Sequence, residues 1–587
     1  MTTTPAIEKV FQGIGVSPGV AHGTIYVYKI ADEVVPEYEI NPEQVATETD
    51  RFEAALVATR QQLHELQERI AAGVGSATPS SILDVHLSIT EDPSLLEPVM
   101  TRLNEEKKNV EYIFNSVAQK YIQTLAEMPD EYLRERAMDV RDVTDRVLRC
   151  LLGRQVRSLS NLPPGTIVVA HDLSPSDTSS LDRKNVIGFA TDVGSHTSHT
   201  AIVARSMNIP AVVGLRDASQ HVHDGQAVIL DGFSGSLVIE PNQQTQFVYG
   251  QLAVKRHTVD ERLAELRQLP AQTLDGHRLA LAGNIELPED MPSLLAAGAE
   301  GVGLFRTEFL YLKRRDFPSE DEQYEKYAEV VRAAQPNAVI IRTLDIGGDK
   351  FRIEDQPTES NPFLGFRAIR YCLANPDIFR TQLRAILRAS AAGNVKIMYP
   401  MISGVGEVRQ ANEILQKVMD DFRRQGIAFD ADIDVGAMME IPSAAMTAEI
   451  IAQEVDFFSV GSNDLVQYTL AVDRVNERVA NLYDPTHPAV LRLIRNCVEA
   501  AHNNNIWCGI CGEMAGEPLY APLLVGMGLD ELSVASASLP RVKEVIRRLN
   551  LSEAQELAGE TLNATDSREV LAMLNALLQR IDPDLTG

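Results

Sequence analysis

The C-terminal half of the chain alternates short apolar segments with longer amphipathic ones, and this repeat constrains the fold more than any other feature. From about Leu274 onward, helical stretches such as "PDIFRTQLRAILRASAAG" separate eight strand-like segments. These are "LALAGNI", "GVGLF", "VIIRTLD", "VKIMYP", "VGAMME", "DFFSVG", "IWCGIC" and "ELSVA". Eight β/α units over roughly 300 residues predict a (β/α)₈ TIM barrel, and a doubly wound open sheet, which normally needs fewer repeats, is the alternative.

The N-terminal half shows two other sequence patterns, one helical and one strand-like. Between about Asn41 and Arg154, apolar residues recur at three- and four-residue spacing, which predicts a helical bundle. The strand-like segment "GTIYVYK" precedes it, and "TIVVA", "VIGFA", "PAVVG", "AVILDG" and "SLVIEP" follow. We therefore predict a multidomain α/β protein: an α/β domain in residues 1–40 and 155–245, an inserted helical subdomain in 41–154, a linker helix in 246–270 and the barrel in 271–580.

Charge and composition narrow the classes of partner. The 587 residues carry a formal charge of −28, which disfavours a nucleic-acid surface but is compatible with a basic protein partner or a small anionic substrate held by local arginines. No run of eighteen apolar residues predicts a membrane span, and the first residues do not resemble a secretory signal. Five cysteines in this length fit a reducing cytosol, so we expect a cytoplasmic protein.

Polar side chains follow several predicted barrel strands, where TIM-barrel sites lie. They are Arg306, Arg342, Glu440, Asn463, Asp464 and Cys511, with Arg474 shortly after. Taken singly, each could be a surface charge or a helix cap, but together they indicate a site. Arginines hold phosphate or carboxylate oxygens, and two carboxylates suit Mg²⁺. The set therefore predicts a small anion with phosphate and carboxylate groups, chelated to magnesium.

The segment "WCGIC" resembles a thioredoxin-type motif. In an extended strand, however, the three residues from Cys508 to Cys511 span roughly 10 Å, whereas a disulfide needs Cα atoms within about 7 Å. The following "GEMAGEP" indicates a loop, whereas a redox motif opens a helix. We expect no catalytic disulfide, and Cys511 suits the role of a proton donor.

The stretch "GSHTSHTAIVARSMNIPAVVG" places His196 and His199 before a predicted helix, "HTAIVARSM", with a preceding Thr or Ser as N-cap. A phosphate on His199 would face unpaired N–H groups and the positive end of the helix dipole. A metal site completed by His221 and His223 is an alternative, and a loop histidine without a role is the simplest one. The predicted anion site favours phosphotransfer.

These motifs carry a family resemblance. "TSHTAIVARSMNIPAVVG" resembles the phosphohistidine signature of phosphoenolpyruvate-utilising enzymes, and the order of the whole chain resembles Enzyme I of the bacterial sugar phosphotransferase system. The match runs from "GIGVSPGVAHG" to the last barrel strand. Its other specific blocks are "GLFRTEFLY", "RTLDIGGDK", "NPFLGFRAIR", "MMEIPSA", "GSNDLVQYTLAVDR" and "CGEMAG".

The resemblance implies a role for each site residue. His199 would accept phosphate from phosphoenolpyruvate, and Cys511 would protonate the enolate carbon to give pyruvate. The other roles would be phosphate binding by Arg306 and Arg342 with Arg367 nearby, Mg²⁺ binding by Glu440 and Asp464, and substrate binding by Asn463 and Arg474.

The resemblance also implies partners and movement. The phosphoryl group would pass to a histidine of a small phosphocarrier protein docked on the inserted helical subdomain. The phosphohistidine domain would swivel between barrel and carrier, and the barrel would dimerise.

Two other functions fit the sequence less well. An ATP-dependent dikinase or synthase would need a large nucleotide-binding domain, and the chain has no Walker-type loop. A non-catalytic regulatory relay of the nitrogen-related branch would be expected to carry an extra N-terminal sensory domain, whereas a regulatory role alongside catalysis stays open. A purely structural role would leave the arginine, carboxylate and cysteine set without a purpose.

Two residues depart from the family pattern. His196 stands where relatives often have arginine, and Cys508 stands where we expect a non-cysteine residue. Cys508 suggests the hypothesis that the neighbourhood of Cys511 is sensitive to oxidation.

If His196 holds phosphate only when protonated, phosphotransfer should weaken as pH rises, because an imidazole loses its charge in this range whereas an arginine does not. We expect the transfer rate of His196→Arg to depend less on pH than that of the parent between about pH 6 and 8. Superimposable pH–rate profiles would reject this role.

Overall fold

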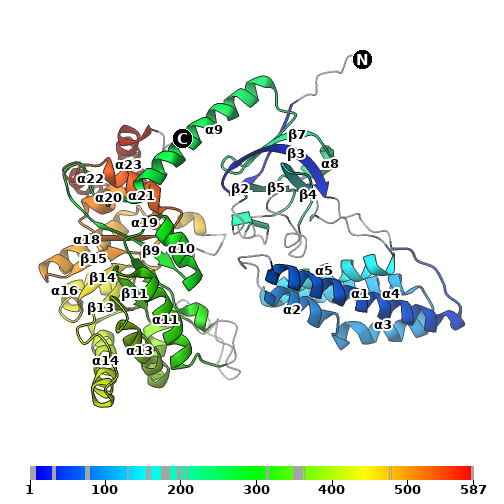
Figure 1. Ribbon diagram of the computed structural model, residues 1–587, viewed down its shortest axis with the longest axis horizontal. Helices are drawn as coiled ribbons and strands as arrows, with labels where there is room; N and C mark the ends of the chain where they lie inside the picture. Colours follow the sequence, from blue (N-terminus) through cyan, green and yellow to red (C-terminus); the bar gives the residue numbers. More distant parts are fainter. Residues whose placement is uncertain are drawn as a thin grey trace. The chain divides into compact units, whose positions relative to one another are not determined.

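The computed structural model describes residues 8–28, 35–72, 80–128, 131–153, 159, 162–173, 185–194, 200–201, 204–205, 209–311, 316–347, 361, 364–474, 476 and 479–583. The chain divides into two compact units, Met1–Lys255 and Arg256–Gly587 (Figure 1). Each unit is described by itself below.

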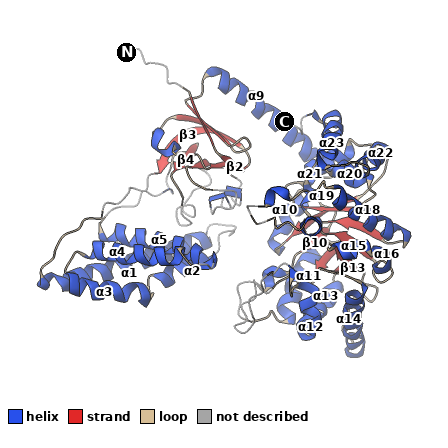
Figure 2. Ribbon diagram, turned by 180° about the vertical axis from the view of Figure 1, so that it is seen from behind, coloured by secondary structure: helices blue, strands red, loops and turns tan. Residues whose placement is uncertain are grey.

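The first unit contains the predicted helices as a bundle. Its helices are α1 (Val45–Ala72), α2 (Ser80–Ile89), α3 (Pro93–Glu106), α4 (Val110–Ala126) and α5 (Glu131–Leu151). They lie side by side in Figures 1 and 2 and share one core, in which the rings of Phe52 and Phe114 are 5.2 Å apart. The three- and four-residue spacing of apolar residues predicts this bundle correctly, because it places one apolar stripe of each helix against the shared core.

The same unit contains an eight-stranded mixed sheet in the order β1-β8-β7-β3-β4-β5-β6-β2. Its strands are β1 (Lys9–Gln12), β2 (Ile14–Ser17), β3 (Val20–Tyr28), β4 (Thr166–Ala170), β5 (Val186–Thr191), β6 (Ala211–Val213), β7 (Ala227–Asp231) and β8 (Ser236–Ile239). The six predicted strands are present, whereas β1 and β2, at four residues each, were not predicted. The neighbours β3, β4, β5 and β6 run parallel, so their carboxyl ends share one edge.

The predicted connecting helix is α9 (Gln243–Leu266). In the second unit, its Arg262 Nε lies 2.5 Å from Glu544 Oε1, and its Nη2 lies 3.5 Å from Asp582 Oδ2. Both carboxylates are buried and also pair with Arg548, which lies just after α21 (Leu539–Arg547). This charge cluster ties the end of α9 to the barrel.

The second unit is a closed parallel barrel, so the predicted TIM-barrel fold is confirmed and the open sheet is not. Its strands are β9 (Ala280–Ile285), β10 (Val302–Phe305), β11 (Val339–Arg342), β12 (Val395–Tyr399), β13 (Val435–Met439), β14 (Phe457–Val460), β15 (Trp507–Ile510) and β16 (Glu531–Val534). Pairing of β16 with β9 closes the ladder. Each strand corresponds to one of the eight predicted segments.

Helices surround the barrel strands (Figure 2). They are α10 (Met291–Ala296), α11 (Glu320–Ala334), α12 (Ala368–Ala374), α13 (Pro376–Ser390), α14 (Val405–Gln425), α15 (Pro442–Met446), α16 (Ala448–Ile451), α17 (Ser462–Leu470), α18 (Pro488–Asn503), α19 (Glu513–Gly516), α20 (Ala521–Gly526), α21, α22 (Leu551–Leu562) and α23 (Ser567–Ile581). One large apolar cluster fills the space between strands and helices, and a smaller one lies inside the barrel. None of the helices that the structure describes is long and apolar enough to cross a membrane.

Candidate active site

Eight of the nine predicted site residues lie where barrel strands end or in the segments that follow. Arg342 ends β11, whereas Arg306, Glu440 and Cys511 follow β10, β13 and β15, Arg367 precedes α12, Asn463 and Asp464 begin α17, and Arg474 lies beyond it. Because all eight strands run parallel, these ends share one rim of the barrel.

Asp345 joins two of the predicted arginines. Its Oδ2 lies 3.1 Å from Nη1 of Arg342, and its Oδ1 lies 2.7 Å from Nη2 of Arg367. Arg342 also donates to Glu308 at 2.7 Å, and Arg367 lies 4.0 Å from Asp464. The structure therefore brings Arg342, Arg367 and Asp464 into one charged cluster.

Both arginines in this cluster are firmly cationic and retain free donors. Burial opposes the charge of Arg342, but Glu308 and Asp345 outweigh it and raise its pKa. The pKa of Arg367 is raised in the same way, chiefly by Asp345. The Nε of each is buried and has no hydrogen-bond acceptor among the described residues. Such donors can bind the oxygens of an incoming phosphate or carboxylate.

Glu440 is a buried carboxylate, with 2% of its surface exposed. Its Oε1 accepts the Met401 N–H at 2.5 Å, and burial, reinforced by Asp464 and Asp345, raises its pKa well above the usual value. Gly461 lies against the other oxygen, because a Cβ there would be 2.7 Å from Oε2. The Met401 N–H and Gly461 thus fix the position of the Glu440 carboxylate, and the positive charge nearby is too small to offset its burial.

The pair of Glu440 and Asp464 fits a divalent cation. A cation between two neighbouring carboxylates would offset both the burial and the mutual repulsion that raise the Glu440 pKa. Nowhere in the described part of the chain do three or more His, Cys, Asp or Glu side chains form a complete metal cage. Two protein carboxylates suit a cation that keeps water and substrate oxygens as its other ligands.

The two residues predicted to hold the substrate form a second cluster around Glu513, which begins α19. The Asn463 amide donates to Glu513 Oε1 at 3.1 Å and accepts the Glu513 N–H at 2.8 Å. Arg474 Nη1 lies 3.9 Å from the same carboxylate. Glu513 is exposed, so a substrate carboxylate could replace its side chain between Asn463 and Arg474.

Arg306 lies at a more open part of the rim. Its Nη1 donates to Glu286 at 2.7 Å, and both side chains are substantially exposed. An exposed ion pair of this kind contributes little stability, so Arg306 can exchange Glu286 for an anionic ligand at small cost.

Cys511 is 3% exposed, and its thiol lies 3.7 Å from the Val460 carbonyl oxygen. Burial raises the pKa of Cys511 to about 11, although a hydrogen bond with the Ser459 side chain and the charge of Arg342 oppose the shift. The thiol therefore remains protonated at neutral pH, as a proton donor must.

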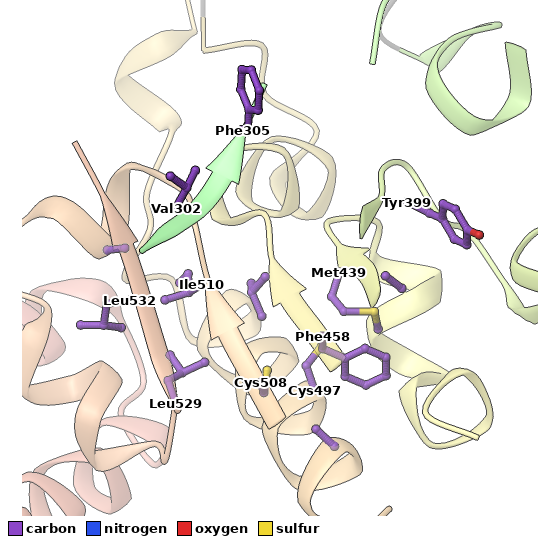
Figure 3. Packing of buried hydrophobic residues seen from close by; sticks show 14 of the residues in the cluster. Val302, Phe305, Tyr399, Met439, Phe458, Cys497, Cys508, Ile510, Leu529 and Leu532 are labelled. Carbon is purple, nitrogen blue, oxygen red and sulfur yellow. The ribbon is translucent and has the colours of Figure 1, made fainter. Parts of the chain in front are cut away.

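Cys508 and Cys511 lie on opposite faces of the barrel wall, because side chains alternate along a strand. Cys511 belongs to the apolar cluster inside the barrel, whereas Cys508 packs outside it with Cys497 of α18 and Phe458 (Figure 3). Both are free thiols. The loop expected after Cys511 is in fact the short helix α19, but the absence of a disulfide holds. The structure does not support a shared environment that sensitises Cys511 to oxidation.

His199 and His196 lie outside the described residues, but the sheet edge that leads to them is described. Asp192, after β5, is buried and accepts the Ser219 N–H and hydroxyl at 2.9 and 2.5 Å, and His171 Nδ1 lies 3.3 Å from it. Thr200, which follows His199, is helical and lies 3.4 Å from the Leu173 carbonyl oxygen. The contact between His171 and Asp192 thus joins the ends of β4 and β5.

His221, one of the ligands in the metal alternative, is engaged locally. Its Nδ1 lies 2.9 Å from the Asp217 carbonyl oxygen, within the short helix α8 (Ala218–His221) and its N-cap.

The sequence analysis missed Glu308, Asp345 and Glu513, although all three lie in motif blocks quoted above. Each carboxylate contacts a predicted arginine or asparagine. A weak signal was present: each of the blocks "GLFRTEFLY", "RTLDIGGDK" and "CGEMAG" contains an acidic residue, and the first two also contain an arginine.

Comparison with known proteins agrees with this arrangement. Three family models match: the N-terminal domain of phosphoenolpyruvate-utilising enzymes over residues 12–136, the mobile domain over 162–235 and the phosphoenolpyruvate-binding domain over 260–551. The phosphoenolpyruvate-protein phosphotransferase of Priestia megaterium is 42% identical over 571 residues, covering 97% of this chain and 99% of that protein. This chain belongs to the phosphoenolpyruvate-protein phosphotransferase family.

Another member of the phosphoenolpyruvate-protein phosphotransferase family matches over nearly the whole chain. The protein of Bacillus subtilis (strain 168) is 42% identical over 564 residues, covering 96% of this chain and 98% of that protein. A solution structure of Enzyme I (nEIt) is 35% identical, covers 42% of this chain and 99% of its own, and has a TM-score of 0.38. The family resemblance drawn from the sequence motifs is confirmed.

Replacing Gly461 with alanine should weaken metal binding, because the new methyl group would press on the Glu440 carboxylate. Disturbed support of a metal ligand typically costs about 10- to 100-fold in affinity. We expect a loss of this size in the calorimetric affinity for Mn²⁺ of Gly461→Ala. Gly406→Ala, in α14, is the control, since its methyl group would meet no atom within 4 Å. Equal affinities in both variants would contradict this placement of Glu440.

Proposed function

We propose that this chain transfers the phosphoryl group of phosphoenolpyruvate to His199 and then to a histidine of a phosphocarrier protein, releasing pyruvate. This is the first step of sugar uptake by a phosphotransferase system. The observation that carries the proposal is the rim cluster, in which Arg342 and Arg367 keep unpartnered Nε donors beside the buried Glu440. The names of full-length relatives support it.

The charge balance of the rim explains why substrate and metal should bind together. Four carboxylates lie around two arginines, Arg342 and Arg367. They are Glu308, Asp345, Glu440 and Asp464. Arg306 is paired with Glu286, so this ion pair adds no net charge. A phosphate and a carboxylate added to this set alone would meet net repulsion. We propose that Glu440 and Asp464 bind Mg²⁺, which would neutralise charge on the phosphoryl oxygens during transfer.

The protein residues then bind the substrate, accept the phosphoryl group and donate a proton. Arg306, Arg342 and Arg367 hold the phosphoryl oxygens, while Asn463 and Arg474 hold the carboxylate in place of Glu513. The His199 imidazole attacks phosphorus and the bond to the enolate oxygen breaks, leaving the electron pair on the enolate. The Cys511 thiol gives its proton to the enolate carbon, which forms the methyl group of pyruvate.

We further propose that the bundle in residues 41–154 docks the carrier protein and that the domain of residues 1–40 and 155–245 swivels between carrier and barrel. Exposed carboxylates on α1 and α3, such as Asp50, Glu53, Glu97 and Glu105, support docking of a basic partner. The linker of residues 246–270 would transmit the swivel to the barrel of 271–580.

Phosphorus-labelled phosphoenolpyruvate should transfer label to the parent protein in the presence of Mg²⁺. The label should be acid-labile and alkali-stable, as expected of a phosphohistidine. It should be lost in His199→Ala and kept in His196→Ala. Label that persists in His199→Ala would move the nucleophile elsewhere, and labelling only from ATP would favour a dikinase.

We also propose that the chain is a cytoplasmic homodimer. Free cysteines support a reducing compartment, and the exposed apolar side chains of Met446 and Ile450, four residues apart, support self-association of the barrel unit.

Replacing Met446 and Ile450 together with glutamate should weaken the dimer, because the new charges would repel across a symmetric interface. Sedimentation of a dilution series should show a parent dimer and a variant that dissociates at higher concentration. A parent that is monomeric throughout, or a variant with an unchanged dimer, would contradict this interface.

A further inference from the structure

Gln382 is a fully buried amide of α13 that lies behind the charged rim and that the transfer mechanism leaves without a role. Its Oε1 accepts the Leu344 N–H at 2.9 Å. Its Nε2 donates to Thr307 Oγ1 at 3.1 Å and to the Tyr327 hydroxyl at 3.2 Å. Because a backbone N–H can only donate, the amide atom that faces Leu344 is the carbonyl oxygen, and this fixes the orientation of the amide. Both N–H groups and the carbonyl oxygen are therefore engaged.

The two rim segments that Gln382 contacts are those that carry the arginines assigned to the phosphoryl group. Thr307 directly follows Arg306, just after β10. Leu344 lies two residues after Arg342, the last residue of β11. A single amide therefore bridges the ends of two neighbouring barrel strands.

The Thr307 hydroxyl extends this bridge to the backbone of Arg342. It accepts the bond from Gln382 and donates to the Arg342 carbonyl oxygen at 3.0 Å. The last pair in the register of β10 and β11 is Phe305 with Ile341, so the hydroxyl and the amide connect the two segments where the strand ladder ends. Thr307 is fully buried, so water is excluded from these bonds.

The carboxylates that orient Arg342 directly follow the two bridged residues. Glu308 follows Thr307, and Asp345 follows Leu344. Nη2 of Arg342 donates to Glu308 at 2.7 Å, and Nη1 lies 3.1 Å from Asp345 Oδ2. A shift of either segment would therefore move the guanidinium group as well as its backbone.

Packing of α13 does not explain this amide. Phe379, Leu383 and Ile386 of the same helix are fully buried in the large apolar cluster, and Arg384 Nε lies 2.5 Å from Glu320 Oε2 of α11. Burying a neutral amide in such an interface costs free energy unless its polar atoms are bonded. An apolar side chain of the same length would fill this position, so the polar atoms are explained by the segments that they hold.

We propose that Gln382 is a positioning residue for phosphoryl transfer, which sets the spacing between Arg306 and Arg342 through its bonds to Thr307 and Leu344. Two groups that bind oxygens of one phosphoryl group must keep a fixed separation, and the amide provides it before the substrate binds. The inference rests on the proposed function, because it presupposes that these arginines hold the phosphoryl oxygens.

Gln382→Met, which keeps the length of the side chain without its polar atoms, tests this role. Rapid-quench measurement of pyruvate formation at subsaturating phosphoenolpyruvate, with Mg²⁺ present, gives kcat/KM. We expect kcat/KM of this variant to fall about ten- to a hundredfold, because a displacement of about 1 Å in a binding group has an effect of this size.

The affinity of Gln382→Met for Mn²⁺ separates positioning from general damage to the barrel. Glu440 follows β13 and Asp464 lies in α17, so neither carboxylate belongs to a bridged segment. Calorimetry without phosphoenolpyruvate should therefore give the parent affinity for Mn²⁺.

Tyr327→Phe is the matched control. It removes one partner of the amide and the bond from the Tyr327 hydroxyl to Gln323 Oε1 at 3.1 Å, but it keeps the bonds of Gln382 to Thr307 and Leu344. Both variants should unfold at a lower temperature than the parent, because each leaves buried polar groups without a partner. Only Gln382→Met should lose kcat/KM.

The Thr307 hydroxyl provides a second test that does not require a change at position 382. Thr307→Val should lower kcat/KM as Gln382→Met does, whereas Thr307→Ser, which keeps the hydroxyl, should recover most of it. Because the two side chains form one bridge, Thr307→Val combined with Gln382→Met should lower kcat/KM little more than either change alone.

Parent kcat/KM in Gln382→Met would overturn the proposal. An equal loss of Mn²⁺ affinity in that variant, or an equal loss of kcat/KM in Tyr327→Phe, would also overturn it, because the amide would then act on the barrel as a whole. If Gln382→Met does not fold, equal kcat/KM in Thr307→Val and Thr307→Ser would overturn the proposal instead. A parent that forms no pyruvate would overturn the proposed function itself, and this outcome is distinguishable because it does not depend on any variant.

Discussion

Closure of the eight-stranded parallel ladder is the constraint on which the rest of the second unit depends. Pairing of β16 with β9 leaves no free edge, so every inward side chain faces the other seven strands. Parallel direction puts all carboxyl ends on one rim, and alternation fixes which residues point inward. Apolar side chains such as Ile340 and Met438 fill the interior beneath the charged rim. The site therefore has charged side chains at the rim and apolar side chains beneath them, and the parallel strands of the barrel enclose both.

At the rim, the arginine side chains are paired with carboxylates. Asp345 fixes Arg342 and Arg367 at 3.1 and 2.7 Å, which orders both guanidinium groups before any ligand binds. Ordering in advance lowers the entropy lost when a ligand is bound. The cost is a rim with little net positive charge around the buried Glu440. Such a rim suits an anion that brings a divalent cation better than it suits an anion alone.

Sequence reasoning was sufficient for the barrel because strand position and period are local properties. The eight apolar segments coincide with β9–β16, and the polar residues at their ends lie on the rim. The contact partners of these residues could not be predicted from the sequence. The hydrogen bonds of Asp345 with Arg367 and of Glu513 with Asn463 join residues that are 22 and 50 positions apart. Likewise, β1 and β2 pair with β8 and β6 from the far end of their domain, and four residues carry too little periodicity to show it.

Burial gives Cys511 two properties that conflict. A pKa of about 11 keeps the thiol protonated until a strongly basic enolate carbon is present, which suits an acid that must not lose its proton early. The same burial separates the resulting thiolate from water, so proton return cannot depend on solvent reaching the sulfur.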